Sequence, residues 1–111
     1  MKRVFSGNRY FALELQFSAD ELKRKLDAQE ENIFLLDVRE QWEFQQANLG
    51  GYLIPFGQHQ KRMNEIDTSK EIIILCQTGS RSQRTTEFLY ENGFRNVKNV
   101  VGGINAYAKT K

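Results

Sequence analysis

The chain has 111 residues, the size of one compact domain, which excludes two domains with independent hydrophobic cores. Hydrophobic residues make up 40% of the sequence and charged residues 27%, which excludes the low-hydrophobicity composition of a disordered protein. A net charge of +2 at pH 7 is too small to indicate a nucleic-acid partner or an anionic membrane surface.

The beginning of the chain is basic, as in a secretory signal, but Glu14 and Gln16 interrupt the apolar stretch that such a signal requires. No export and no membrane span are therefore expected. Cys76 is the single cysteine, so an intramolecular disulfide is excluded, and a free thiol persists more readily in a reducing compartment. These observations predict a cytoplasmic location.

Short apolar runs alternate with longer amphipathic stretches, and this alternation predicts an α/β sheet with crossover helices. The first strand is expected over residues 12–17. Ser18 and Glu21 then have the spacing of a capping box, which predicts a helix from this point to about residue 29. Residues 1–17 are interpreted as an N-terminal segment with the first strand, and residues 18–109 as the body of the single domain.

The second expected strand, residues 33–36, is a continuous apolar run that ends abruptly at Asp37. Buried parallel strands end in this way at the carboxyl edge of a sheet, where α/β proteins bind their ligands. A short helix over residues 41–46 is expected next, with Trp42 or Phe44 packed inward. A brief strand at residues 52–54 and a weaker helical segment at residues 58–66 follow.

The clearest central strand is residues 72–75, four apolar β-formers that lead directly into residues 76–82. A helix is then expected over residues 81–92, with Gly93 as its left-handed C-cap. The last strand is expected at residues 97–101 and a final short helix at residues 104–109.

The segment after the central strand carries the chemistry. Cys76 would face a helix N-terminus, whose unpaired amides and dipole favour a thiolate, and Arg81 adds a positive charge. Gly79 allows successive N–H groups to point toward a common centre and form an anion nest. A buried structural thiol is the alternative interpretation of Cys76. The predicted nucleophile is Cys76, and the predicted substrate-binding residues are Gln77, Thr78, Gly79, Ser80, Arg81 and Ser82.

Four motifs, in this order, resemble the rhodanese-like domains over most of the chain. They are Leu36-Asp37-Val38-Arg39-Glu40 followed by Glu43-Phe44, the loop Cys76-Gln77-Thr78-Gly79-Ser80-Arg81-Ser82, Asn92-Gly93-Phe94 with Asn96-Val97, and Gly102-Gly103-Ile104. The resemblance implies that Cys76 becomes a persulfide within a cradle of loop amides. It also implies a three-layer α/β sandwich, in which helices flank a five-stranded, mainly parallel sheet.

Two positions depart from the pattern of this family. Residues 47–52 replace a Gly-His-Ile-x-Gly-Ala-type stretch, which leaves the shape of one pocket wall and its effect on specificity open. Tyr107 stands where the family usually carries tryptophan, an aromatic exchange that should preserve packing.

The reaction that the resemblance implies is a double displacement. The Cys76 thiolate attacks the outer sulfur of thiosulfate or a related small anionic donor, and cyanide, glutathione or a protein thiol then removes that sulfur. No metal or other cofactor, no nucleic acid and no membrane is expected to take part. Related phosphatases and arsenate reductases have a loop one residue longer, so they are a less favoured alternative. A persulfide-relay or regulatory interaction module also stays open.

Asp37 and Arg39 are candidates for supporting the loop from behind. Asp37 could orient the loop or, equally, cap turn amides or pair with Arg39. His59 has no metal-ligand spacing around it and is expected to be solvated. Six basic residues could form a positive rim that steers anionic donors, or they could be scattered over the surface: Lys61, Arg62, Arg81, Arg84, Arg95 and Lys98.

Overall fold

The computed structural model describes residues 14–111, in which five strands form one sheet. The strand order is β1-β5-β4-β2-β3, and every neighbouring pair is parallel. This confirms the predicted α/β architecture. The strands are β1 (Gln16–Phe17), β2 (Ile33–Asp37), β3 (Tyr52–Leu53), β4 (Glu71–Leu75) and β5 (Val97–Val100).

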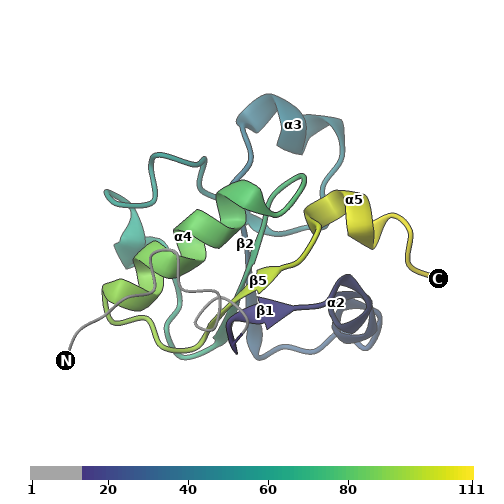
Figure 1. The fold of residues 1–111 in the computed structure, drawn as a ribbon, viewed down its shortest axis with the longest axis horizontal. Helices are drawn as coiled ribbons and strands as arrows, with labels where there is room; N and C mark the ends of the chain where they lie inside the picture. Colours follow the sequence, from purple (N-terminus) through teal and green to yellow (C-terminus); the bar gives the residue numbers. More distant parts are fainter. Residues whose placement is uncertain (1–13) are drawn as a thin grey trace.

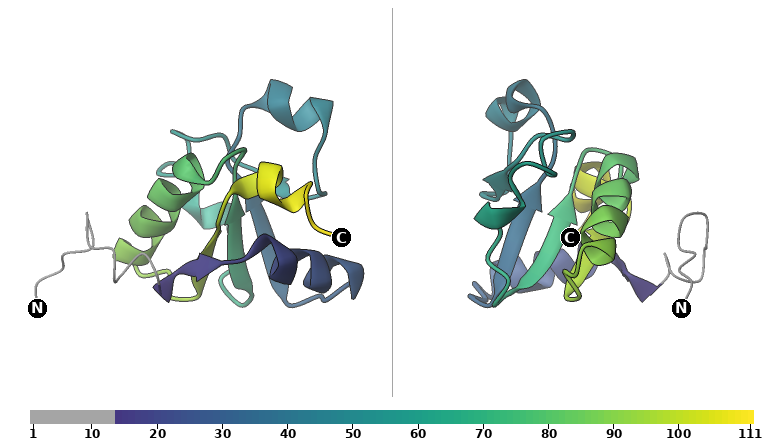
Figure 2. Two further views of the ribbon diagram at one scale, coloured as in Figure 1. Left: turned by 45° about the vertical axis from the view of Figure 1, so that its right-hand side comes forward. Right: turned by 90° about the vertical axis from the view of Figure 1, so that its left-hand side faces the viewer.

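Helices lie on both faces of this sheet and beyond one of its edges (Figures 1 and 2). One face packs against α2 and α5, and the opposite face packs against α4. The short helix α3 lies beyond the carboxyl ends of the strands, above the starts of α4 and α5 in Figure 1. The helices are α2 (Ala19–Asp27), α3 (Gln41–Gln46), the 3-10 turn η1 (Met63–Glu65), α4 (Ser80–Glu91) and α5 (Gly103–Tyr107).

From Ile72 to Leu75 the central strand β4 is apolar, because both of its faces are covered. Ile72 and Ile74 belong to the cluster that contains Leu89 of α4, whereas Ile73 and Leu75 belong to the cluster on the α2 side. Successive side chains of a strand point to opposite faces, so a strand between two helical layers needs apolar residues at every position. This strand therefore fixes the position of the residue that follows it, Cys76.

The helix α2 begins as predicted but is shorter than expected. The Ser18 hydroxyl accepts a hydrogen bond from the Glu21 amide at 3.0 Å, which satisfies one of the free amides of the first turn. The helix ends at Asp27, and the chain passes through a positive φ of 56° at Gln29. Of the first expected strand, residues 16 and 17 form β1, and residues 12 and 13 lie outside the described part of the chain.

The prediction of a helix over residues 58–66 is wrong. The structure has turns there, followed by the three-residue η1. The reason is the absence of an apolar stripe at helical spacing: Met63 and Ile66 reach the core, but Gln58, Gln60 and Lys61 are polar and exposed.

Of the two residues of α3 that were expected as alternatives to pack inward, Trp42 does not, since its side chain is 62% exposed, and Phe44 is half-buried. The helix α3 lies past the edge of the sheet rather than on a face, and it has no buried residue. Within residues 14–111, every helix is too short or too polar to cross a lipid bilayer.

Candidate active site

The sulfur atom of Cys76 is buried directly after β4 and points into the turn that starts α4. Cys76 is fully buried, and its Sγ accepts hydrogen bonds from the Gly79 amide at 3.0 Å and the Ser82 amide at 3.3 Å. Amides at the start of a helix favour a negatively charged acceptor. These three residues, Cys76, Gly79 and Ser82, are called the sulfur cradle here.

The Ser82 hydroxyl has a single hydrogen but three acceptors within reach. It lies 3.3 Å from Cys76 Sγ, 3.2 Å from the Gly79 carbonyl and 2.5 Å from Asn99 Oδ1. The shortest contact takes the hydrogen best, so the hydroxyl mainly donates to Asn99, whose amide group in turn donates to Gln16. The two backbone amides are therefore the steady donors to the sulfur, and the sequence analysis missed Asn99.

The turn at the start of α5 holds the cysteine loop in place from the side away from α4. The Ile104 amide donates to the Cys76 carbonyl at 2.9 Å, and the Asn105 amide donates to the Gln77 carbonyl at 3.1 Å. Gly103 has a φ of 58°, and a Cβ there would lie 2.3 Å from the Cys76 carbonyl oxygen. The start of α5 thus approaches the cysteine loop more closely than a side chain allows, which explains the glycine motif physically.

Arg81 makes a paired salt bridge with Glu43 of α3. Its two terminal nitrogens donate to the two carboxylate oxygens at 2.9 and 3.0 Å. The hydrogen bond from Arg81 lowers the pKa of Glu43 below its ordinary value of 4.5, and the same bond raises the pKa of Arg81. Glu43 was noticed in the sequence only as part of a motif. Its pairing with Arg81 means that the positive charge expected for Cys76 is shared with a carboxylate.

Asp37 and Arg39 form a buried pair that supports the loop. Arg39 donates to Asp37 through Nε and Nη2 at 3.0–3.3 Å, and both residues are at most 2% exposed. Arg39 also donates to the Glu43 carbonyl at 3.3 Å, the Ala47 carbonyl at 2.8 Å and Gln77 Oε1 at 3.3 Å. Asp37 therefore pairs with Arg39 and accepts a hydrogen bond from the Arg39 amide, and Arg39 in turn contacts Gln77 of the loop.

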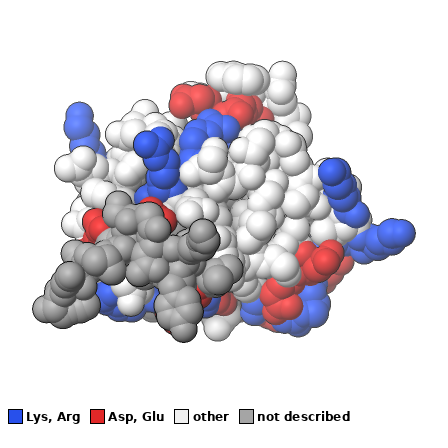
Figure 3. Space-filling model, in the orientation of Figure 1, with Lys and Arg blue, Asp and Glu red and all other residues white. Residues whose placement is uncertain are grey.

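The remaining loop residues lie at the opening of the site. Thr78 and Ser80 are exposed, and Gln77 donates to Asn105 Oδ1 at 2.7 Å. The residues Thr78, Ser80, Arg81 and Glu43 are called the rim here. Figure 3 shows acidic and basic side chains side by side over α3 and the start of α4, so this surface is not uniformly positive.

The family model of the rhodanese-like domain matches residues 18–110. The chain belongs to the rhodanese-like domain family. It is 38% identical over 90 residues to the putative sulfur carrier protein YrkF of Bacillus subtilis (strain 168), covering 80% of this chain and 48% of that protein. It is 36% identical over 93 residues to the putative sulfurtransferase YtwF of the same organism, covering 83% of this chain and 88% of that protein. The resemblance drawn from the four motifs is confirmed.

Solved structures agree with the family assignment. A rhodanese-like domain protein from Staphylococcus aureus superposes with a TM-score of 0.75 at 30% identity, covering 83% of this chain and 89% of that chain. The chain spans about half the length of YrkF. Membership of the rhodanese-like family, with relatives named for sulfur transfer, supports sulfur transfer in general as the chemistry of this domain.

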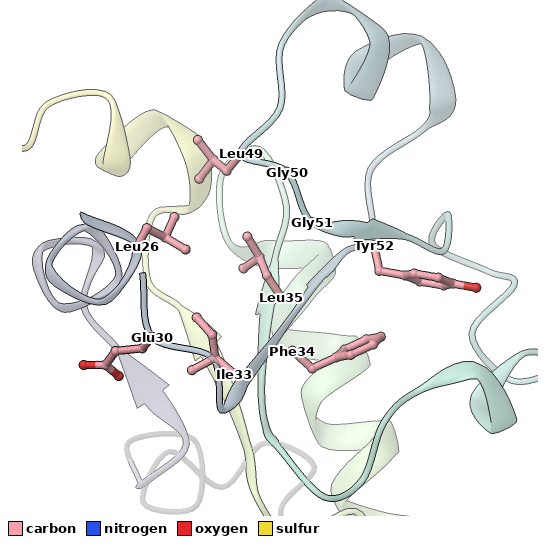
Figure 4. Close-up of a pocket in the computed structure, with 9 residues that line it drawn as sticks. All are labelled: Leu26, Glu30, Ile33, Phe34, Leu35, Leu49, Gly50, Gly51 and Tyr52. Atoms are coloured by element: carbon pink, nitrogen blue, oxygen red, sulfur yellow. The ribbon is translucent and has the colours of Figure 1, made fainter. Parts of the chain in front are cut away.

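The segment that departs from the rhodanese-like pattern lies mostly away from the cysteine loop. Leu49, Gly50, Gly51 and Tyr52 line a groove of about 300 Å³ beside β2. Figure 4 shows Leu26, Ile33, Leu35 and Leu49 around this groove, with Tyr52 and Phe34 pointing away together. No residue of the cysteine loop lines this groove, and the Ala47 carbonyl accepts a hydrogen bond from Arg39, which also contacts the loop.

His59 differs from its expectation as a solvated residue. Its ring is partly buried and packs at 4.9 Å from the ring of Phe88 and 5.6 Å from that of Phe56, measured between centroids. This burial lowers the pKa of His59 below 6.5. The cause is that the chain turns back onto the core at this point rather than continuing as an exposed helix.

Of the two alternatives for the six basic residues, a positive rim or a scatter over the surface, the contacts of Arg62, Lys98 and Arg95 fit the scatter. Arg62 pairs with Glu65 at 2.8 Å, and Lys98 lies 3.8 Å from Glu71 at the amino end of β4. Arg95 stacks on the ring of Tyr90, 4.3 Å from its centroid. Of the six basic residues, Arg81 is the one that belongs to the cysteine loop.

Proposed function

We propose that this domain transfers sulfane sulfur, from thiosulfate or a related donor to a thiophilic acceptor, through a persulfide on Cys76. The observation that carries the proposal is the sulfur cradle, in which two backbone amides at the start of α4 donate to Cys76 Sγ. A thiolate held in this way needs no separate base. The sulfur-related names of the relatives support the same chemistry.

The reaction has two displacement steps. With thiosulfate, the Cys76 thiolate attacks the outer sulfur, the S–S bond of the donor breaks, and sulfite leaves with the bonding electrons. The persulfide anion on Cys76 then extends toward the rim, where loop amides and hydroxyl groups stabilise it. A thiolate or cyanide attacks the outer sulfur in the second step and releases Cys76 as a thiolate. Because the cycle needs a free thiol, we place it in a reducing compartment such as the cytoplasm.

Hydrolysis of phosphate esters is disfavoured by the state of Glu43. A phosphatase needs a general acid to protonate the leaving alkoxide. Glu43 is the carboxyl group beside Arg81, but the hydrogen bond from Arg81 lowers its pKa and keeps it ionised. The four residues between Cys76 and Arg81 also give the shorter of the two loop lengths.

A persulfide relay to a protein acceptor is the second candidate. Trp42, next to Glu43 in α3, is 62% exposed, and a large exposed aromatic side chain is typical of contacts with another protein. The relay would use the same Cys76 persulfide. It differs from the first candidate in having little turnover with small acceptors.

Intact-protein mass spectrometry tests the proposal. The protein is incubated with thiosulfate or with cysteine persulfide and then chased with cyanide, and Cys76→Ser and Ser69→Ala, an exposed serine outside the cysteine loop, are treated in parallel. We expect a gain of one sulfur, about 32 Da, in the wild type and in Ser69→Ala, but not in Cys76→Ser. Cyanide should remove the added sulfur as thiocyanate. If neither donor adds sulfur to the wild type, sulfur transfer is excluded.

A further inference from the structure

We propose that Glu43 determines the class of sulfur donor. By occupying Arg81, it favours donors with no anionic oxygens on the sulfur that is bonded to the transferred sulfur, namely thiol persulfides, over thiosulfate. This inference rests on the proposed sulfur transfer through Cys76 and concerns the choice of donor for that step.

The argument begins with the geometry of the ion pair. Arg81 uses both terminal nitrogens for the two oxygens of Glu43, at 2.9 and 3.0 Å. This paired arrangement is also the one in which a guanidinium group binds an oxyanion of a ligand. Glu43 and the anionic oxygens of thiosulfate therefore compete for the same N–H groups.

Glu43 is held firmly enough to be a real competitor. Its side chain is 11% exposed, and Oε1 also accepts a hydrogen bond from the Glu40 amide at 2.8 Å within the capping box of α3. The hydrogen bond from Arg81 lowers the pKa of Glu43, so the carboxylate is charged at neutral pH. A donor that needs Arg81 has to displace a carboxylate that two groups hold in place.

The charges around the opening act in the same direction. The pKa of Arg81 is raised chiefly by the hydrogen bond to Glu43, and the charges of Cys76 and Glu40 add to this effect. The second arginine near the loop, Arg39, is bound to the buried Asp37. The opening thus combines one shared cation with two carboxylates and the thiolate, which opposes the entry of a dianion such as thiosulfate.

A thiol persulfide meets less opposition and still completes the step. The Cys76 thiolate attacks the terminal sulfur of R–S–SH, and the S–S bond of the donor breaks. The thiolate RS⁻ leaves with the bonding electrons and takes the proton of the transferred sulfur. The products are the Cys76 persulfide anion and the thiol RSH, so the step needs no external oxidant or reductant.

The test compares the rates at which Cys76 gains sulfur from thiosulfate and from cysteine persulfide, by mass spectrometry in single turnover. Glu43→Gln removes the charge but keeps an oxygen for the capping box. We expect it to raise the second-order rate constant with thiosulfate about tenfold, and that with cysteine persulfide by less than about twofold. Glu91→Gln is the matched control, since it removes an exposed carboxylate at the other end of α4 and leaves the pair with Arg81 intact, and it should change both rates by less than about twofold.

A double variant tests whether the effect passes through Arg81. In Glu43→Gln/Arg81→Gln the gain with thiosulfate should disappear, because the freed guanidinium is gone. Sulfate, an inert oxyanion, should also inhibit loading from cysteine persulfide more strongly in Glu43→Gln than in the wild type. If wild-type Cys76 is loaded but Glu43→Gln changes both donors equally or neither, the inference about Glu43 is wrong and sulfur transfer stands. If wild-type Cys76 is loaded by neither donor, the proposed function itself fails.

Discussion

The sulfur cradle and the rim of the same loop are built in different ways. In the cradle, buried backbone amides at the start of α4 contact Cys76, and the start of α5 closes the loop from behind. The rim consists of exposed or half-buried side chains, two of which form the Glu43–Arg81 pair. Backbone donors locked by packing suit a fixed chemical step, whereas exchangeable side-chain pairs suit the choice of substrate. Changes in the cradle and its support should therefore affect folding and activity together, and changes in the rim should affect activity much more than stability.

The largest effect on stability is expected from Arg39→Ala. Its removal leaves the carboxylate of Asp37 buried without its partner, which costs about 3–5 kcal/mol. Urea unfolding measures this loss. Arg24→Ala, which removes an exposed arginine paired with Glu21 on α2, is the control and should cost less than about 1 kcal/mol. Equal losses of unfolding free energy in the two variants would mean that the buried Asp37–Arg39 pair stabilises the protein no more than an exposed ion pair does.

Gly103→Ala should be nearly as harmful. The new Cβ would lie 2.3 Å from the Cys76 carbonyl oxygen, so α5 has to move away from the loop, at a cost of about 3 kcal/mol. Loading of Cys76 should fall with it. Gly93→Ala has a comparable positive φ but no atom within 4 Å, and it should cost only about 1 kcal/mol and leave loading unchanged. Normal loading in Gly103→Ala would show that α5 does not hold the cradle.

Arg81→Gln should separate activity from stability. Its pair with Glu43 is partly exposed, so its loss should lower the free energy of unfolding by less than about 1 kcal/mol. The rate of loading from thiosulfate should nevertheless fall, because the remaining carboxylate of Glu43 repels the donor. Thermal melting and mass-spectrometric loading measure the two quantities. A large drop in melting temperature would mean that Arg81 stabilises the fold rather than acting on the substrate.

The Glu43–Arg81 pair should also contribute to the pH dependence of stability. The pKa of Glu43 is lower in the folded protein than its ordinary 4.5, so its ionisation stabilises the fold above pH 4.5. That contribution is lost as the pH falls below 4.5 through the folded-state pKa. The difference in melting temperature between wild type and Glu43→Gln should therefore be larger at pH 7 than in acid. A difference that does not change with pH would argue against a charged pair.

The smallest effect is expected from Trp42→Ala. The side chain is 62% exposed and α3 buries no residue, so the free energy of unfolding should change by less than about 0.5 kcal/mol. Urea unfolding checks this value. A loss of several kcal/mol would show that the Trp42 side chain packs inward, which is one of the two alternatives that the sequence predicted.

The features that were predicted correctly depend on neighbours in the chain. The apolar run of β4, the Ser18 cap of α2 and the glycine after α4 each follow from a few adjacent residues. The position of Cys76 between a buried strand and a helix start has the same local origin. The helix over residues 58–66 was predicted wrongly because its polar residues give it no apolar stripe to bury. Trp42 is exposed because α3 lies past the end of the sheet rather than on one of its faces.

The sequence alone was sufficient to place Cys76, its loop and the strand segments, because hydrophobic periodicity and turn residues act over short distances. The five-stranded, mainly parallel sheet was implied by the resemblance to the rhodanese-like domains. The tertiary structure decided which side chains surround that loop. Glu43 meets Arg81 and Arg39 meets Gln77 across 38 residues each, and Gly103 approaches the Cys76 carbonyl from the end of another strand. These contacts depend on how parallel strands align at one edge of the sheet, and no local pattern contains that alignment.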